Sequence, residues 1–426
     1  MSYLVKILFY SEGLVMTKLL CLLLFIPVIV LGQDSLNVSL LGRVTNVGVT
    51  TSVDMNGTMA YVGGGGDGLF ILDLSDPSNP VVLGNSDTGG HARDVILSGN
   101  LVYEADDAGG LRIIDVSNPA EPAELGSYDT PGATHSVAVV GDYCYIADGW
   151  DGLRVIDVSN PAEPTEVGTY LTPAYSKGLA VSGDIAYVAD GATGLIAIDI
   201  STPSAPELIS SLETPGFGRD VAVQGNYAYV ADYASGMQIV DISDPSSMEI
   251  VGSFHTDGQT EDVAVSGNYV FLADYGTGLR VIRVDDPTLP VEVGYYYTDD
   301  NAWGVDVDGR HVCLAEEAQV LILDISIATS APDQRNTLPN TFSLFPLYPN
   351  PFNNTANIVF DLPHEVTGKL VVYDVLGRVA NTLYDGKLSA GSHQMQFNGN
   401  GLSSGTYFVK LETPDFHAVQ KAVLLK

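Results

Sequence analysis

Positively charged residues are scarce in this sequence. Its 426 residues include 18 Lys and Arg against 52 Asp and Glu, a formal net charge of −34. A protein that binds nucleic acid needs clustered cations to neutralise phosphates, so this composition argues against a nucleic-acid partner. It favours a soluble, self-repelling surface, and we expect a monomer.

Long apolar stretches are almost absent as well. The one extended apolar run covers residues 19–31 and follows the basic Lys18. A basic start followed by a short apolar core predicts a signal peptide over residues 1–32, with Met16 as the expected start of translation. No later stretch is long enough to cross a bilayer, so we expect no membrane span after cleavage.

Sustained helical periodicity is also missing, and a repeat takes its place. The segment "LRIIDVSNPAEP" at 111–122 returns as "LRVIDVSNPAEP" at 153–164, 42 residues later. Seven copies begin at Leu41, Leu83, Leu125, Val167, Ile209, Val251 and Val293. Each copy contains four short apolar segments bounded by Gly, Asn, Asp and Pro, which is typical of strands and turns. Four strands per repeat predict an all-β fold, a seven-bladed β-propeller over residues 33–328.

The seventh copy lacks an outer strand. The missing strand is present at the other end of the repeats, as "LNVSLLGRV" at 36–44. We therefore expect the N-terminal segment to complete the last blade, which would hide two sheet edges. Cys144 and Cys313 fall at non-equivalent positions in distant repeats, which favours two buried thiols over a disulfide.

The sequence changes character after residue 328. Residues 329–343 are rich in Ser, Thr, Pro and Asn and predict a linker. Residues 344–426 again alternate like strands but do not repeat every 42 residues. This pattern predicts a small Ig-like β-sandwich.

Two resemblances rest on specific motifs. The recurring "YVAD" and "GLRVIDVS" resemble the LVIVD-repeat family of bacterial β-propellers, over about residues 35–328. That resemblance implies an extracytoplasmic seven-bladed propeller and brings almost no chemistry with it.

The C-terminal motifs are "YPNPFN" at 348–353, "VYDVLGR" at 372–378 and "GLSSGTYFVKL" at 401–411. They resemble the C-terminal sorting domain of proteins that Bacteroidetes and related bacteria export by the type IX secretion system. The resemblance implies this machinery as a partner, and a secreted or cell-surface location on a Gram-negative bacterium. An ordinary accessory Ig-like domain is the alternative.

Several residues recur in register in most copies. They are an aspartate followed two residues later by serine (Asp73, Asp115, Asp157, Asp199 and Asp241) and a loop glycine (Gly68, Gly110, Gly152, Gly194, Gly236 and Gly278). A catalytic group would be unique to one place, so these residues predict turn scaffolding and positive φ. The loop aspartates, including Asp148 near Asp151, suit turn caps better than calcium ligands, because a calcium loop needs about six oxygens. We expect no cofactor, with calcium as a weak alternative.

Function is expected where the copies differ. One position before the innermost strand of each blade, which we call the mouth position, reads Thr51, Arg93, His135, Lys177, Arg219, Glu261 and Trp303. Four successive copies place a basic or imidazole group there. The glycine loops contribute Trp150, Tyr233 and Tyr275, and the segments before the innermost strands add His91, Tyr175 and Phe217. Propeller geometry puts both sets on one face.

These residues predict a binding site at the channel mouth for an acidic glycan, a carboxylated ligand or an acidic protein loop. The alternative is that the cations pair with neighbours such as Asp94 and Asp220 and line a wet channel. A non-catalytic binding or adhesion module is therefore our first hypothesis. A propeller hydrolase or lyase acting on extracellular polysaccharide would need an acid and a base, for which His91 with His135, or Glu261, are candidates. A structural envelope protein also remains open.

Overall fold

The computed structural model describes residues 35–326, 328, 342–344, 347, 352, 355–414 and 416–425. The expected signal peptide and most of the expected linker lie outside these residues. Within them, no helix is long and apolar enough to cross a membrane.

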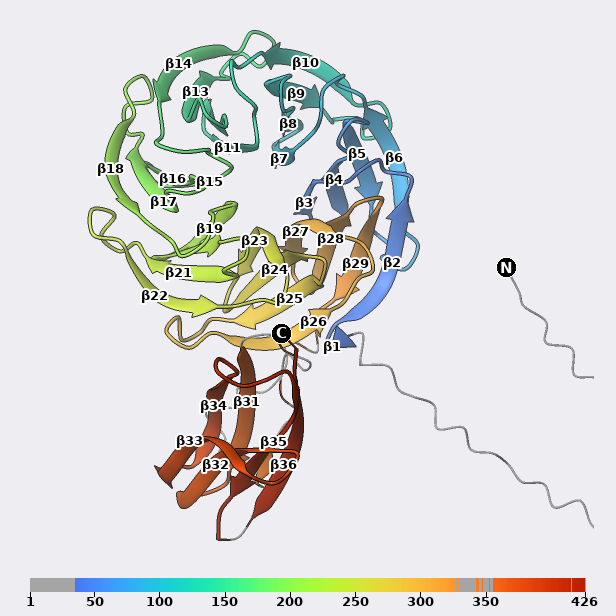
Figure 1. The fold of residues 1–426 in the computed structure, drawn as a ribbon. Helices are drawn as coiled ribbons and strands as arrows, with labels where there is room; N and C mark the ends of the chain where they lie inside the picture. The colour runs from blue at the N-terminus through green and yellow to red at the C-terminus, as the bar shows by residue number, and fades with distance from the viewer. Residues whose placement is uncertain are drawn as a thin grey trace, which may run out of the picture. The chain divides into compact units, whose positions relative to one another are not determined.

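Seven antiparallel sheets form a ring of blades, as Figure 1 shows. Blade one consists of β3 (Ser52–Asn56), β4 (Met59–Gly63), β5 (Leu69–Asp73) and β6 (Val81–Ser86). Blade two consists of β7 (Asp94–Ser98), β8 (Leu101–Ala105), β9 (Leu111–Asp115) and β10 (Ala123–Tyr128). Blade three consists of β11 (Ser136–Val140), β12 (Tyr143–Ala147), β13 (Leu153–Asp157) and β14 (Thr165–Tyr170). Blade four consists of β15 (Gly178–Ser182), β16 (Ile185–Ala189), β17 (Leu195–Asp199) and β18 (Glu207–Leu212). Blade five consists of β19 (Asp220–Gln224), β20 (Tyr227–Ala231), β21 (Met237–Asp241) and β22 (Glu249–Phe254). Blade six contains β23 (Gln259–Ser266), β24 (Tyr269–Tyr275), β25 (Gly278–Arg283) and β26 (Val291–Tyr296). Blade seven contains β27 (Ala302–Asp308), β28 (His311–Glu316) and β29 (Gln319–Asp324).

The core lies between neighbouring blades. The second and third strands of each blade read as nearly continuous apolar runs, because both faces of a blade are covered. Tyr145 and Val155 of blade three, for example, pack in one cluster with Leu179 and Ile196 of blade four. Seven such layers make each blade depend on its two neighbours, and they fix the ring that surrounds the channel.

The N-terminal strand closes the ring as predicted. Strand β2 (Ser39–Thr45) pairs antiparallel with β29, from Ser39 opposite Asp324 to Thr45 opposite Gln319, and is the outer strand of blade seven. A second short strand, β1 (Ser35–Leu36), pairs with β26 and extends blade six. The sequence pattern did not indicate β1, because two residues carry no periodicity. The N-terminal segment therefore joins two blades.

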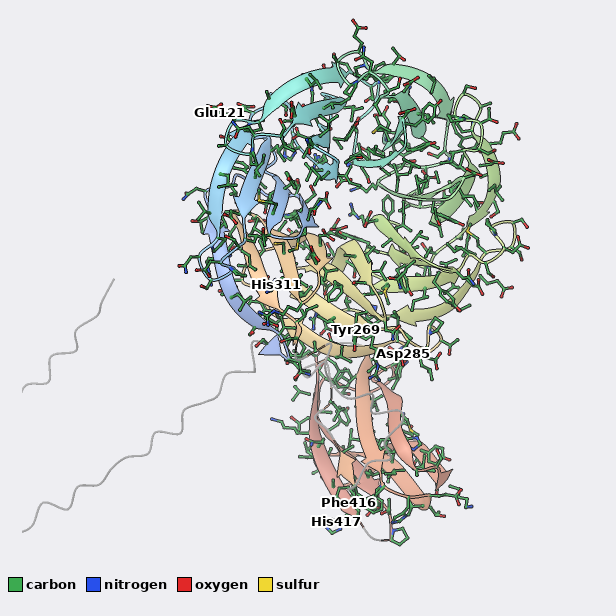
Figure 2. All side chains as sticks on the ribbon, turned by 180° about the vertical axis from the view of Figure 1, so that it is seen from behind. Glu121, Tyr269, Asp285, His311, Phe416 and His417 are labelled. Atoms are coloured by element: carbon green, nitrogen blue, oxygen red, sulfur yellow. The ribbon has the colours of Figure 1, made fainter. Side chains whose placement is uncertain are left out.

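The recurring turn residues are scaffold. The backbone N–H of Ser117 donates to Oδ1 of Asp115 at 2.9 Å, and the equivalent bond occurs in the blades of Asp73, Asp157, Asp199 and Asp241. All six loop glycines have positive φ, between 72° and 85°. Glu121, in one of the Pro-containing turns, lies at the outer rim of the ring (Figure 2). Cys144 and Cys313 are free and buried, as expected.

A glycine in the outer strands marks a close contact between blades. A Cβ on Gly126 would overlap the carbonyl oxygen of Pro161 in the next blade. Blade four has Ser210 at this position, and its hydroxyl donates to the carbonyl oxygen of Pro245 at 2.6 Å. The outer strands therefore touch the turn of the following blade through a residue without a bulky side chain.

We expect Gly126→Val to lower the free energy of unfolding by about 1–3 kcal/mol, because the added methyl groups overpack this contact. Gly126→Ser, which copies blade four, is the matched comparison: its Cβ meets the same Pro161 oxygen, so it should also lose stability, but less than Gly126→Val because it adds no further methyl groups. Urea denaturation of both variants measures the difference. Equal losses for the two variants would show that the contact tolerates no side chain at all in blade two.

The C-terminal residues form the predicted sandwich. One sheet contains β30 (Ser343–Leu344), β31 (Thr355–Leu362) and β34 (Gly391–Asn398). The other contains β33 (Val379–Leu388), β32 (Val366–Asp374), β35 (Gly405–Glu412) and β36 (His417–Leu424). Phe360, Phe397 and Val409 are fully buried in one cluster of both sheets.

Candidate functional site

A cavity of about 420 Å³ lies on the propeller axis, and all seven mouth positions line it. Five mouth residues directly precede an innermost strand, and Glu261 and Trp303 lie within the first three residues of β23 and β27, so the seven blades bring seven side chains to one level. Arg93, Lys177 and Arg219, which the sequence predicts to lie at one level, therefore line one cavity. Residues 33–328 contain only nine Lys and Arg, and three of them meet here.

The two mouth arginines have acidic neighbours, but not the ones expected from sequence. Nε and Nη2 of Arg93 donate to Oδ2 of Asp107 at 3.0 and 2.7 Å. Nε of Arg219 lies 3.6 Å from Oε2 of Glu261. The Arg93 and Asp107 side chains are 38% and 25% exposed, and ion pairs of exposed groups contribute about 0–1 kcal/mol. A ligand carboxylate could therefore replace Asp107 at little cost.

Aromatic rings hold the Arg219 guanidinium in place. Its carbon lies 4.2 Å from the ring centre of Tyr233 and 5.4 Å from that of Phe217. Cation–π contacts of this kind fix the plane of a guanidinium while leaving its N–H groups free to donate. Tyr275 contacts Trp303 edge to face, with ring centres 5.0 Å apart.

His135 belongs to an aromatic chain that runs outward from the cavity. Its Nε2 lies 2.7 Å from the Tyr175 hydroxyl, and the Tyr175 ring contacts the Trp150 ring at 5.2 Å between centres. Trp150 is 69% exposed. Burial, with Lys177 and Arg93 nearby, lowers the pKa of His135 to about 4. The imidazole is therefore neutral at pH 7, and the positive arc has three members.

Lys177 is the mouth cation without a partner. Among the residues that the structure describes, its ammonium makes no hydrogen bond or ion pair. The reason is local: Asp107 and Tyr233 hold Arg93 and Arg219 from the glycine loops, whereas the same loop position beside Lys177 is Gly191. Burial, followed by the charge of Arg219, lowers the pKa of Lys177 to about 8. The Trp303 indole N–H is also buried without a partner among the described residues.

The loop residues that hold the arginines are strained. Asp107 has φ of 49° and Tyr233 has φ of 52°, in the left-handed region. Glycine occupies this loop position at Gly65, Gly149 and Gly191, also with positive φ. A side chain in that conformation costs about 1–2 kcal/mol. Strained side chains retained next to a cavity point to function. The sequence analysis did not predict a role for Asp107. The presence of aspartate at a loop position that is glycine in three other blades could have indicated one.

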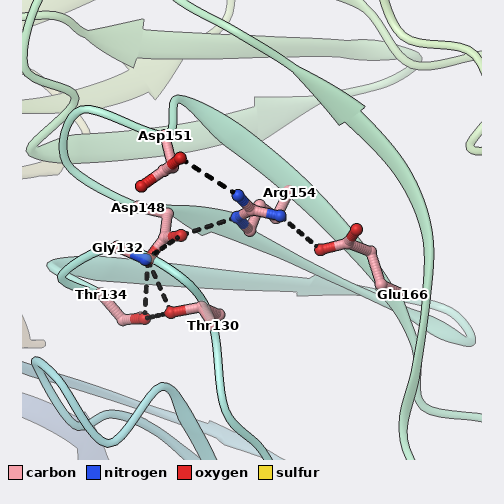
Figure 3. A network of polar contacts seen from close by, with 7 residues as sticks. All are labelled: Thr130, Gly132, Thr134, Asp148, Asp151, Arg154 and Glu166. Atoms are coloured by element: carbon pink, nitrogen blue, oxygen red, sulfur yellow. Dashed lines mark hydrogen bonds and ion pairs between the residues drawn. The ribbon is translucent and has the colours of Figure 1, made fainter.

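The sequence analysis also did not identify arginines at one strand position of three blades, of which Arg154 and Arg280 are buried. In blade three, Nε of Arg154 lies 2.6 Å from Oδ2 of Asp148, and Nη1 lies 2.7 Å from Oε2 of Glu166 (Figure 3). Arg112 and Arg280 occupy equivalent positions and contact their own loop aspartate and outer-strand glutamate. In blade four, Ile196 stands at the position of the arginine and Leu208 at the position of the outer-strand glutamate, so both charged residues are absent together. These triads are internal to blades and do not reach the cavity.

The loop aspartates cap turns. Asp148 accepts hydrogen bonds from the hydroxyls of Thr130 and Thr134 and from the backbone N–H of Gly132 (Figure 3). Asp148 and Asp151 both contact the Arg154 guanidinium, at 2.6 and 3.5 Å. Within the described part of the chain, no three His, Cys, Asp or Glu side chains are placed together to hold a metal.

Five aspartates line the cavity farther along the innermost strands: Asp54, Asp94, Asp220, Asp262 and Asp306. Their carboxylates bond to the next blade instead of to the mouth cations. The backbone N–H of Val137 donates to Asp94 at 3.0 Å, and that of Met55 donates to Asp306 at 2.6 Å, across the ring closure. Burial raises the pKa of Asp94 and Asp306 to about 7. The channel is thus cationic at its mouth and acidic below.

Comparison with known proteins agrees with this architecture. The LVIVD repeat model matches seven times, over residues 47–88, 89–130, 131–172, 173–214, 215–256, 257–298 and 300–332. Residues 346–425 match the secretion system C-terminal sorting domain. No curated protein matches the chain.

The similar solved structures show the fold alone. The β-propeller domain of Cps50 (Swd1) from Myceliophteria thermophila is 16% identical with a TM-score of 0.56, covering 67% of this chain and 99% of that one. A chain of a mitotic checkpoint complex is 14% identical with a TM-score of 0.57, covering 67% and 94%. The designed protein Ika8 is 12% identical with a TM-score of 0.51, covering 66% and 98%.

The sorting domain indicates export by the type IX secretion system to the cell surface or the extracellular space. The repeat matches together span well over half of the 426 residues. The chain therefore belongs to the LVIVD-repeat family of β-propellers, with a secretion sorting domain at its C-terminus.

Proposed function

We propose that the propeller is a non-catalytic binding module that takes a carboxylate group of an extracellular acidic glycan at its channel mouth. The observation that carries the proposal is the unpartnered ammonium of Lys177, between Arg93 and Arg219, on the wall of the cavity. A charge-assisted hydrogen bond to a carboxylate would satisfy it. The buried N–H of Trp303 offers a further donor.

The layering of charge favours a ligand group that stays at the mouth. The carboxyl groups below the mouth offer no cation to a carboxylate that moves deeper, so the mouth is the level that favours an acidic group. The chain carries a net charge of −34, and an acidic polymer is repelled elsewhere on its surface. A carboxylate would therefore find one attractive position on the propeller.

A glycan suits the surroundings better than an acidic protein loop. A cavity of about 420 Å³ is in the size range of small-molecule sites, and it has room for one or two sugar rings. Exposed Trp150, braced by Tyr175, provides an aromatic face beside the mouth on which a neighbouring sugar could stack. A protein loop would make less use of such a platform.

A pair of matched ligands tests the proposal. Oligogalacturonate and its methyl ester have the same sugars and linkages and differ only in the carboxylate. By isothermal titration calorimetry we expect the acid to bind at least about tenfold more tightly than the ester, because hydrogen bonds to charged groups contribute about 1.5–3 kcal/mol. The difference should shrink in 1 M salt. Equal affinities for acid and ester would refute the carboxylate site.

A further inference from the structure

Lys177 is the only lysine of the propeller. Residues 33–328 contain eight arginines and this one lysine. It is half-buried on the cavity wall, whereas lysine is normally exposed. Arginine serves at the equivalent positions 93 and 219, so simple anion binding does not require a primary amine here. The amine itself therefore needs an explanation.

The surroundings of Lys177 favour a nucleophilic amine. No described residue donates to or accepts from its nitrogen, and with its pKa lowered to about 8 about half of it is neutral at pH 8, against less than about 1% of an ordinary lysine. A desolvated lysine beside other cations is the usual activated form of this nucleophile. Glu261 lines the same cavity, and burial raises its pKa, which favours a carboxyl group able to hold a proton.

We propose that Lys177 captures a carbonyl compound that also carries a carboxylate, by forming a reversible imine. The inference rests on the proposed function, because Arg93 and Arg219 would hold the carboxylate while the carbonyl carbon meets the amine. The nitrogen lone pair adds to the carbonyl carbon and forms the C–N bond. The C=O π bond breaks as the C–N bond forms, and one nitrogen proton passes to the oxygen, which gives a carbinolamine. The Glu261 carboxyl then protonates the hydroxyl, which departs as water while the nitrogen lone pair forms the C=N bond, and the nitrogen returns a proton to the Glu261 carboxylate. No oxidant or reductant takes part, and water reverses the reaction.

Reductive trapping of the full chain tests the imine. Glyoxylate, which has an aldehyde and a carboxylate, is added with sodium cyanoborohydride, and each lysine is followed by peptide mass spectrometry. Cyanoborohydride reduces an imine to a stable secondary amine. Exposed lysines of the sandwich, such as Lys369 and Lys387, serve as references in the same sample. We expect Lys177 to react at least about tenfold faster than these references. Reaction of Lys177 at or below their rate would overturn the proposal.

Two comparisons test the role of the carboxylate. Acetaldehyde has the same aldehyde without the carboxylate, so it should lose most of the preference for Lys177. Arg93→Ser with Arg219→Ser should remove the preference of Lys177 for glyoxylate over acetaldehyde. An undiminished preference in that variant would overturn the arrangement proposed.

The outcomes separate the two proposals. If the wild-type chain binds oligogalacturonate but Lys177 reacts only like the reference lysines, the imine proposal fails and the proposed function stands. If Lys177 reacts rapidly with glyoxylate but oligogalacturonate does not bind, the imine proposal stands and the glycan-binding function fails.

Discussion

Arg154→Ala should lower the free energy of unfolding by about 3–5 kcal/mol, the cost expected when one partner of a buried ion pair is removed. Asp148 is fully buried, and its carboxylate loses its contact with the guanidinium at 2.6 Å. Glu166 loses its partner at the same time. Threonine hydroxyls still bond to Asp148, but they do not neutralise its charge. Guanidinium chloride denaturation would measure the loss.

The chain supplies a matched control for this variant. Blade four has Ile196 and Leu208 where blade three has Arg154 and Glu166, and both blades keep the buried loop aspartate. The double variant Arg154→Ile with Glu166→Leu copies blade four. We expect it to lose less stability than Arg154→Ala, because the charge of Glu166 is removed together with its partner, while Asp148 keeps only hydroxyl and N–H donors, as Asp190 does in blade four. An equally large loss in both variants would show that blade three needs the triad itself.

The propeller should be more stable in mild acid than at pH 8. Burial raises the pKa of Asp54 to about 6 and the pKa of Asp94 and Asp306 to about 7. A carboxyl group whose pKa is raised by folding contributes stability below its ordinary pKa near 4, and loses it as the pH rises through the folded value. We therefore expect the free energy of unfolding to fall by about 3 kcal/mol or more between pH 5 and pH 8, or about 6–12 °C in Tm.

Asp94→Asn tests this assignment. The amide oxygen can still accept the N–H of Val137, while the titrating group is gone, so the decline between pH 5 and pH 8 should become shallower. Asp157→Asn is the control, because that exposed turn aspartate has its pKa lowered by the side-chain hydroxyl and backbone N–H of Ser159. It should leave the slope in this window unchanged. An unaltered slope in Asp94→Asn would contradict a role for the channel carboxylates.

The fold could be predicted from the sequence because every blade of a propeller repeats the same order of strands and turns. A 42-residue repeat reveals the number of blades, and an incomplete last copy reveals the closing strand. Strand β1 escaped notice, since two residues form no pattern. The sandwich was readable from strand alternation and its motifs.

The candidate site could be predicted from the sequence only in part. Register alone brought Arg93, Lys177 and Arg219 together, because equivalent positions of a ring lie at one level. The partners of the cations could not be predicted: the alternative to ligand binding paired them with residues such as Asp94, whose carboxylate instead bonds to the backbone of the next blade. The unpartnered state of Lys177 depends on Gly191 in the adjoining loop, and the buried triads depend on contacts across a sheet. Such properties follow from packing rather than from periodicity.

Binding of a carboxylate by the three mouth cations underlies both proposals. The most direct measurement is the affinity of oligogalacturonate for Arg93→Ser/Lys177→Ser/Arg219→Ser, compared with Arg43→Ser/Arg310→Ser/Arg378→Ser, which removes the same charge from exposed positions outside the cavity. We expect at least about 100-fold weaker binding for the mouth variant, because charged hydrogen bonds are lost. We expect a change of less than about threefold for the control, because exposed distant charges are screened. Equal affinities for the two variants would refute carboxylate binding by the mouth cations.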